Sequence, residues 1–451
     1  MATTAPVSQP VASDERTGRP RRRKLRRTDG MRWQVGFIIV MLCLWEGFPF
    51  PLIGLRNVVG YQAFAAIVFL GTPIYFFRAA IRRFSFTYWD FLPLLLFFIC
   101  VAASVFYSGI LVPAPLREWL PAIYTIAPVL LIFPLKAIGA NLRDAEKALY
   151  YSGIFASLLV IVNGFAELHI LDFYVRGSGF GTENRVVFFK LEATFALVIA
   201  LLRLVYARKV SRFLGAGLAT FITFYNVFVL SESRLAIAAV LISLALSWLF
   251  VMGAARKLFF LLLAPLVAVP VIAFVIEKYL RGSDNMSTYM SNDVSAKFRA
   301  TENVHFGHYF DGTSGIGFGF MSGNAEYNNI IAYSANRAGY AYGTRDYGLS
   351  LDDIGIYSAL YQYGYAGLIV ILLMTGLAVW SLARSTRLGP DYAPIAAVGL
   401  LMLSFMFSPI SMNYFTLFYT GHIGGLLWFM ASSVSRSSSG RVTATTRKGP
   451  R

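Results

Sequence analysis

Long apolar runs, separated by short polar and basic connections, make up most of the chain. Each run is long enough to cross the ~30 Å hydrocarbon layer of a bilayer as a helix. A segment exposed to lipid must satisfy its own backbone hydrogen bonds, so a helix is the expected form of every run. The pattern therefore predicts an all-α, polytopic helical membrane protein with about twelve transmembrane helices. Their approximate centres are residues 42, 68, 98, 130, 157, 195, 222, 243, 266, 367, 403 and 423.

One polar segment is much longer than the other connections and divides the chain. It covers residues 277–353 and separates predicted helices at 33–276 from those at 354–432. Polar tails rich in Ser, Thr, Pro and Arg flank the helices at 1–32 and 433–451, and their composition predicts disorder. A loop as long as residues 277–353 inside a compact fold usually carries function.

The long loop is rich in tyrosine and carboxylate residues. Such a surface suits sugars, because aromatic rings stack on the apolar face of a sugar and polar groups bind its hydroxyls. Tyrosine is also enriched at the interface between membrane and water. A sugar-binding loop and an amphipathic lid resting on the membrane are therefore both open interpretations.

Composition supports the membrane prediction. Of the 451 residues, 57% are hydrophobic and only 14% are charged, whereas ordinary globular domains carry about 25% charged residues. The net charge of +17 would be compatible with nucleic-acid binding. However, most of the basic residues lie in the tails and in alternate short connections such as RAAIRRF, ARKVSRF and GAARK. This distribution is typical of cytoplasmic loops, so no nucleic-acid partner is expected.

The same distribution orients the chain. It predicts that both termini are cytoplasmic and that the long loop faces outward. The basic segment RRRKLRR, Arg21 to Arg27, precedes the first apolar run. We interpret it as a topology determinant that is also attracted to anionic lipid headgroups. No small-residue cleavage site follows the first run, so an uncleaved anchor is predicted rather than a signal peptide. The two cysteines, Cys43 and Cys100, lie in apolar runs and indicate neither a disulfide framework nor a metal site.

A first candidate for chemistry is the sequence SESR, which interrupts two apolar runs and ends at Arg234. The predicted topology places it at the outward junction of two helices. An arginine there could simply mark the interface by extending its head group to water. It could also bind phosphate, because guanidinium offers a planar fork of donors and stays charged at physiological pH. A charge at the edge of a membrane span is a functional candidate by default.

A second candidate lies in the long loop, in KFRATENVHFGHYFDGTSGIGFGF. Arg299 is a further basic residue on the outward side. His305 and His308 could bind a metal, but no third ligand follows at a convincing spacing, so hydrogen-bonding or structural roles are favoured and no metal is predicted. The glycines of GIGFG do not form a nucleotide-binding fingerprint. They are expected to permit a tight turn against the helix bundle.

A third candidate is the acidic pair Asp352 and Asp353, where the loop re-enters the membrane. Aspartate strongly favours the first positions of a helix, so capping is one interpretation. The alternative is a general base at the outer mouth of the bundle. Of the remaining ionisable residues inside apolar runs, Lys190 and Glu192 could pair or line a channel. His169 and His422 stand alone in the sequence and are interpreted as structural.

Taken in chain order, these three features resemble the O-antigen ligase and polymerase superfamily of bacterial inner-membrane glycosyltransferases. The resemblance covers roughly residues 180–380. Arg234 matches the arginine of the family at an SR helix start, and Arg299 is similar to the arginine before its glycine-rich turn. Gly364 and Gly367, in YGYAGL, match its paired glycines.

One position departs from the ligases of that family. They place a histidine, in a His-Asn pair, where this sequence has Asp353 followed by Ile354. The form DDIG looks more like the exopolysaccharide and O-antigen polymerase branch. The resemblance implies a donor glycan on undecaprenyl pyrophosphate, presented at the outer face of the bacterial inner membrane, and a second lipid-linked glycan as acceptor. It also implies membrane-lipid contacts and partners such as a chain-length regulator or export proteins.

The resemblance assigns roles to the candidate residues. Arg234 and Arg299 would bind the pyrophosphate and stabilise it as it leaves. Asp353 would deprotonate the acceptor hydroxyl, with Asp352, His305 or His308 as alternatives. No metal and no cofactor is required for this chemistry.

Two other functions compete with polymerisation. A ligase of the same superfamily would transfer the glycan to a different acceptor. A transporter or flippase would fit the predicted helix count. The sequence shows no internal repeat, which many transporters have. Its notable charges also cluster at the outer rim of the predicted bundle rather than at the middle of the membrane, with Lys190 and Glu192 as exceptions.

Overall fold

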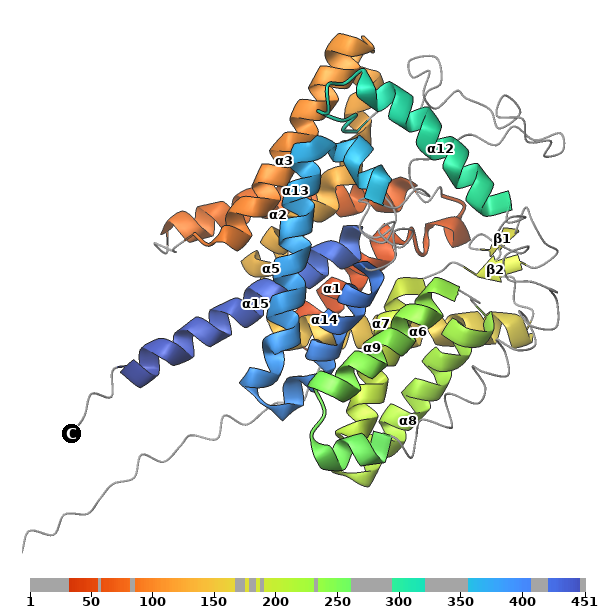
Figure 1. Cartoon of the computed structure of the whole chain (residues 1–451), viewed down its shortest axis with the longest axis vertical. Coiled ribbons are helices and arrows are strands. Elements are labelled where there is room, and N and C mark those ends of the chain that lie inside the picture. The colour runs from red at the N-terminus through yellow and green to blue at the C-terminus, as the bar shows by residue number, and fades with distance from the viewer. Residues whose placement is uncertain are drawn as a thin grey trace, which may run out of the picture.

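A computed structural model describes the chain over residues 32–55, 58–81, 86–166, 175–177, 184–186, 190–230, 234–260, 294–320, 356–406 and 421–446. These residues form a helical bundle with one short antiparallel hairpin, in which Arg176 pairs with Arg185 (Figure 1). The helices are α1 Trp33–Trp45, α2 Val58–Ile81, α3 Tyr88–Val105, α4 Leu116–Trp119, α5 Ile132–Ala137, α6 Leu142–Ala166, α7 Lys190–Val205, α8 Val210–Phe224, α9 Arg234–Phe250, α12 Val294–Asp311, α13 Ile356–Ala383, α14 Ala393–Met406 and α15 Gly421–Thr446. The strands are β1 Val175–Gly177 and β2 Asn184–Val186. Shorter helical segments are η1 Phe50–Ile53, η2 Phe106–Leu111, η3 Leu120–Leu130, η5 Tyr225–Leu230, η9 Arg384–Leu388 and η10 Pro390–Tyr392.

Within the described residues, five helical segments are long and apolar enough to cross a membrane. They are Val59–Ile81, Tyr88–Leu111, Leu142–Phe165, Val210–Leu230 and Ile356–Leu388. Shorter apolar helices occupy Trp33–Trp45, Ala236–Phe250 and Pro390–Phe405. The chain is thus helical and consistent with a membrane protein, as predicted from its apolar runs. The predicted span centred near residue 266 lies outside the described residues.

The predicted span centred near residue 130 differs from the prediction, because it is not a single helix. The chain there forms the 3₁₀ segment η3 and the short helix α5. Pro121, Pro128 and Pro134 explain the difference. Each lacks a backbone N–H and its ring clashes with the preceding turn of an α-helix. Despite its irregular backbone, the segment is packed inside the bundle, and Ile126, Val129 and their neighbours are buried.

The C-terminal tail also differs from the prediction, since α15 continues as a helix past residue 433 to Thr446. Extending an existing helix requires no new nucleation step, so a polar segment can continue an apolar one. Two partly buried serines of α15 bond back to the preceding turn. Ser433 Oγ donates to the Phe429 carbonyl at 3.1 Å and Ser435 Oγ to the Ala431 carbonyl at 3.1 Å. The predicted long loop likewise contains a helix, α12.

Helix α7 lies at the centre of the packing. It contacts α6, α8, α9 and α14, and nearly every residue from Leu191 to Val205 is buried. Helix α1 packs on α6 and α15, and α13 packs on α3, α14 and α15. Lipid cannot reach α7 through these neighbours, which explains why this helix can carry charged residues among its apolar ones.

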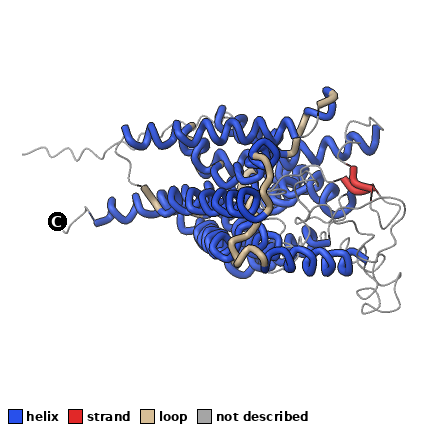
Figure 2. The backbone as a smooth tube through the Cα atoms, turned by 90° about the horizontal axis from the view of Figure 1, so that it is seen from above, coloured by secondary structure: helices blue, strands red, loops and turns tan. Residues whose placement is uncertain are grey.

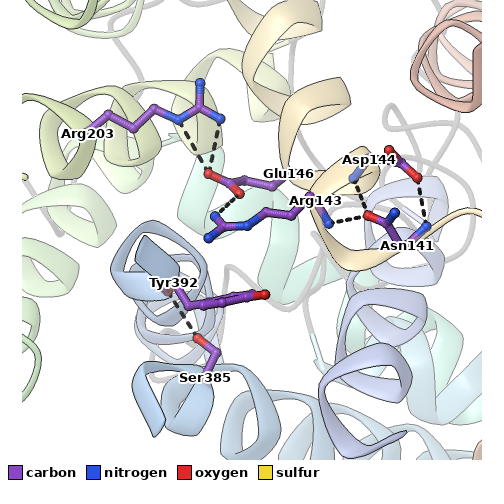
Figure 3. A network of polar contacts seen from close by, with 7 residues as sticks. All are labelled: Asn141, Arg143, Asp144, Glu146, Arg203, Ser385 and Tyr392. Atoms are coloured by element: carbon purple, nitrogen blue, oxygen red, sulfur yellow. Dashed lines mark hydrogen bonds and ion pairs between the residues drawn. The ribbon is translucent and has the colours of Figure 1, made fainter. Parts of the chain in front are cut away.

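A network of charged residues joins several helix ends on one side of the bundle (Figure 3). Glu146, near the start of α6, is buried and accepts from Arg143 at 2.7 Å and from Arg203 of α7 at 3.1 Å. The Arg143 guanidinium also lies 4.0 Å from the centroid of the Tyr392 ring. These are the helix ends that the predicted topology assigns to the cytoplasm.

Further polar contacts lie at helix ends that the predicted topology also assigns to the cytoplasm. Arg32, before α1, pairs with Asp144 of α6 at 2.9 Å. Lys136 of α5 pairs with Asp90 of α3 at 2.8 Å, and both side chains are buried. Tyr206, after the end of α7, donates to the carbonyl of Val251, after the end of α9. Burial raises the pKa of Tyr206, although the nearby Arg256 opposes this shift.

Helix α12 and the hairpin lie on the other side of the bundle. Figure 1 shows α12 and the β1–β2 pair far from the C-terminal end of α15, and Figure 2 shows the strands and the C-terminus at opposite ends as well. The described part of the predicted loop, α12, and the C-terminal end of α15 thus lie on opposite sides of the bundle.

Candidate functional site

The glycine-rich turn after α12 docks into a break in α13. Gly364 has φ 68° and ψ −177°, so the helical hydrogen-bond pattern is interrupted there. Two backbone groups of the turn replace the missing partners: Phe318 N donates to the Tyr361 carbonyl and Gly319 N to the Gln362 carbonyl, both at 2.8 Å. The N–H of Tyr365 donates in return to the turn, at Gly315 O and 3.0 Å. Two segments that are far apart in sequence are therefore locked together by main-chain bonds.

Glycine is required at this junction for two physical reasons. Gly317 and Gly364 have φ values of +94° and +68°, a region that side chains strongly disfavour. The two backbones also approach closely, and a Cβ on Gly317 would lie 2.5 Å from the Gly364 nitrogen. The expectation that GIGFG forms a tight turn against the bundle is therefore confirmed.

Helix α12 is held beside the turn by a small aromatic cluster. Phe306, Phe310 and Phe318 pack with Tyr107 of η2 and Tyr361 of α13, and all five are buried. A hydrogen bond also joins α13 to α12, because Tyr361 Oη donates to Asn303 Oδ1 at 2.7 Å. The turn is also tied to α3, because Phe320 N donates to Ser104 Oγ at 2.7 Å.

The two candidate arginines lie on different helices. Arg234 is the first residue of α9, and Arg299 lies in the first half of α12. Their side chains, and the whole of Asp352 and Asp353, lie outside the described residues.

The two candidate histidines lie on less buried faces of α12. His308 is exposed, and its ring lies 5.7 Å from that of Tyr309. His305 is half-buried, with its ring 5.0 Å from Tyr309. Among the residues that the structure describes, neither joins a group of three metal-ligating side chains. The same helix carries an acid that sequence reasoning did not single out, Glu302, which is fully buried one turn after Arg299.

Sequence reasoning also missed a cluster formed by Glu46, Glu192 and His422. His422 Nε2 lies 2.8 Å from Glu192 Oε1 and 3.8 Å from Glu46 Oε1. The prediction treated His422 as isolated and considered Lys190 as the partner of Glu192. The Glu192–His422 pair joins residues separated by 230 positions, so no local spacing could have indicated it. The one available signal was that Glu192 is an acid inside an apolar run.

We expect Tyr361→Phe to loosen α12 while the chain remains folded. The variant removes only the hydroxyl that donates to Asn303, and a hydrogen bond of this kind contributes about 0.5–1.5 kcal/mol. Limited proteolysis and hydrogen exchange should show faster opening of α12. Tyr357→Phe is the matched control, because Tyr357 is exposed on the same helix and stacks on Tyr361. Equal protection of α12 in both variants would contradict the assigned contact.

The turn at residues 315–319, helix α12 and the start of α13 lie together on one side of the bundle. Helix α12 carries basic, acidic and imidazole residues. Neither a scan against protein-family models nor a search of curated proteins found a match to this chain.

Proposed function

We propose that this chain is a bacterial inner-membrane glycosyltransferase. In this proposal it polymerises oligosaccharide repeat units, carried on undecaprenyl pyrophosphate, into exopolysaccharide or O-antigen at the periplasmic face. The observation that carries the proposal is the main-chain junction between the turn at residues 315–319 and α13 at Gly364. These segments hold two of the three motifs that resemble the superfamily, and their docking gives both motifs a shared structural role.

The proposed reaction is a displacement at the donor sugar. A hydroxyl oxygen of the acceptor glycan forms a bond to the anomeric carbon, and the bond from that carbon to the pyrophosphate oxygen breaks. The lipid pyrophosphate leaves with the electron pair. Arg234 and Arg299 stabilise the charge that develops on it, because a preorganised guanidinium needs no rearrangement at the moment of reaction.

The proton of the acceptor hydroxyl passes to a base in the same proposal. Asp353 is the first candidate, and Asp352, His305 and His308 are alternatives. The observed positions of His305 and His308 on α12, beside the docked turn, support their place in this set. Proximity of two large lipid-linked substrates would supply much of the rate.

The proposed location follows from the charge distribution. Both termini would be cytoplasmic and the segment 277–353 periplasmic. The charged contacts at one end of the bundle, and α12 at the other, support this arrangement.

Supplying the purified full chain with a lipid-linked repeat unit tests the proposal. A ladder of products, each longer by one repeat, is the expected result. Reactions without added donor serve as the blank. Transfer to a single unrelated lipid acceptor, without a ladder, would indicate a ligase instead. Movement of the intact lipid-linked glycan across a liposome membrane without any covalent product would overturn the proposal in favour of a flippase.

A further inference from the structure

Three ionisable side chains from three helices meet inside the bundle. Glu46 follows the end of α1, Glu192 lies in the first turn of α7, and His422 is the second residue of α15. Taking one ligand atom from each residue, the imidazole nitrogen and the two carboxylate oxygens all lie within 4.8 Å of one another. The described parts of α7 and α15 begin beside Glu192 and His422, although the predicted spans are centred near residues 195 and 423. The cluster therefore ties together three separate parts of the chain.

Burying these ionisable side chains costs free energy unless a further group pairs with them. Glu192 and His422 have 0% exposed side chains, whereas Glu46 is 19% exposed. The Glu192 carboxylate faces His422 through Oε1, yet its Oε2 has no hydrogen-bond partner within the described structure, and neither has His422 Nδ1. A buried carboxylate that is incompletely paired costs several kcal/mol. The hydrogen bond between Glu192 and His422 therefore offsets only part of this cost.

The donor set suits a divalent metal ion. One imidazole nitrogen and two carboxylates are ligands for ions such as Zn²⁺ and Mn²⁺. Two ligands of one ion can lie no farther apart than about twice the metal–ligand distance, which is about 4.0–4.4 Å for the 2.0–2.2 Å distances of zinc. His422 Nε2 lies within that limit of both carboxylates, at 2.8 Å from Glu192 and 3.8 Å from Glu46, so binding an ion requires only a small shift of the side chains from their present spread of up to 4.8 Å. The partial exposure of Glu46 provides a side from which an ion can enter.

We propose that Glu46, Glu192 and His422 bind one divalent metal ion of the zinc or manganese class. The ion joins the ends of α1, α7 and α15 and stabilises the bundle where these helices meet. It balances the carboxylates inside a region of low dielectric. This role is structural and separate from the proposed glycosyl transfer, so either proposal can fail without the other.

Metal binding to the full chain in detergent tests this inference. The protein carries an affinity tag without histidine, is stripped with a chelator, and is dialysed against Zn²⁺ or Mn²⁺. We expect about one ion per chain by elemental analysis. We also expect a higher melting temperature with the ion, because a ligand that binds only the folded state stabilises it.

Variants locate the ion. Glu192→Gln and His422→Ala should lose it, and Glu46→Gln should weaken binding about tenfold or more. Glu46→Gln keeps the test valid if changes at the fully buried positions prevent folding, which size-exclusion chromatography would reveal. His308→Ala is the control, since this exposed histidine lies on another helix and its loss should leave the ion in place. Binding of no ion by the wild-type chain, or equal binding by folded Glu46→Gln, would reduce the cluster to a hydrogen-bonded His–Glu pair.

Discussion

Alanine at Arg234 or at Arg299 is expected to abolish polymer extension while the protein still accumulates in the membrane. Removing one preorganised donor that stabilises a leaving group typically lowers turnover by about 10²–10³. The length of product formed from a lipid-linked repeat unit measures the effect. Arg234→Lys should also be poor, because an ammonium group does not reproduce the planar fork that matches phosphate oxygens.

The control for this pair is Arg212→Ala. Arg212 is exposed near the start of α8, at a helix end that the topology assigns to the cytoplasm. Its loss should leave product length unchanged. Normal product length from both the Arg234 and the Arg299 variants would remove the proposed pyrophosphate site. A loss shared with Arg212→Ala would instead point to a general effect of charge on folding or insertion.

Gly364→Ala should prevent the turn from docking and strongly destabilise the bundle. A Cβ at residue 364 would lie 2.5 Å from the Gly315 carbonyl oxygen and would also clash with the carbonyl of Ile316. The backbone of Gly364, with φ 68° and ψ −177°, lies in a region open essentially to glycine alone and adds about 1–3 kcal/mol of strain for alanine. The main-chain bonds of the junction would be lost as well. We expect a total loss of more than about 3 kcal/mol, measured as a lower melting temperature and rapid proteolysis after α12.

The same helix offers a control of identical chemistry. Gly376 also lies in α13, and a Cβ there would meet nothing within 4 Å. Gly376→Ala should therefore be neutral or stabilising by up to about 1 kcal/mol, because alanine favours a helix more than glycine does. Similar stability of the two variants would show that the break in α13 does not need the conformation and the space that only glycine provides.

Local sequence patterns predicted the helices and the tight turn. An apolar run fixes its own preferred backbone, because unpaired peptide groups are costly in lipid, and the runs at α2, α3, α6, α8 and α13 became long helices. The turn was also predictable, since clustered glycines permit backbone angles that other residues disfavour. Composition misled at the C-terminus, where polar residues after 433 continue α15. Helix propagation, rather than hydrophobicity, decides that segment.

The sequence by itself determined that the chain is helical and apolar, that it changes direction at basic connections, and that its chemistry-bearing motifs follow a given order. Only the tertiary structure decided which distant residues meet. The break in α13 is stable because a turn some fifty residues away in sequence bonds to its carbonyls. Likewise, Glu46, Glu192 and His422 form a cluster because the end of α1 meets the first turns of α7 and α15. Contacts between such distant residues depend on how separate helices pack, and the spacing of residues along the chain carries no information about that packing.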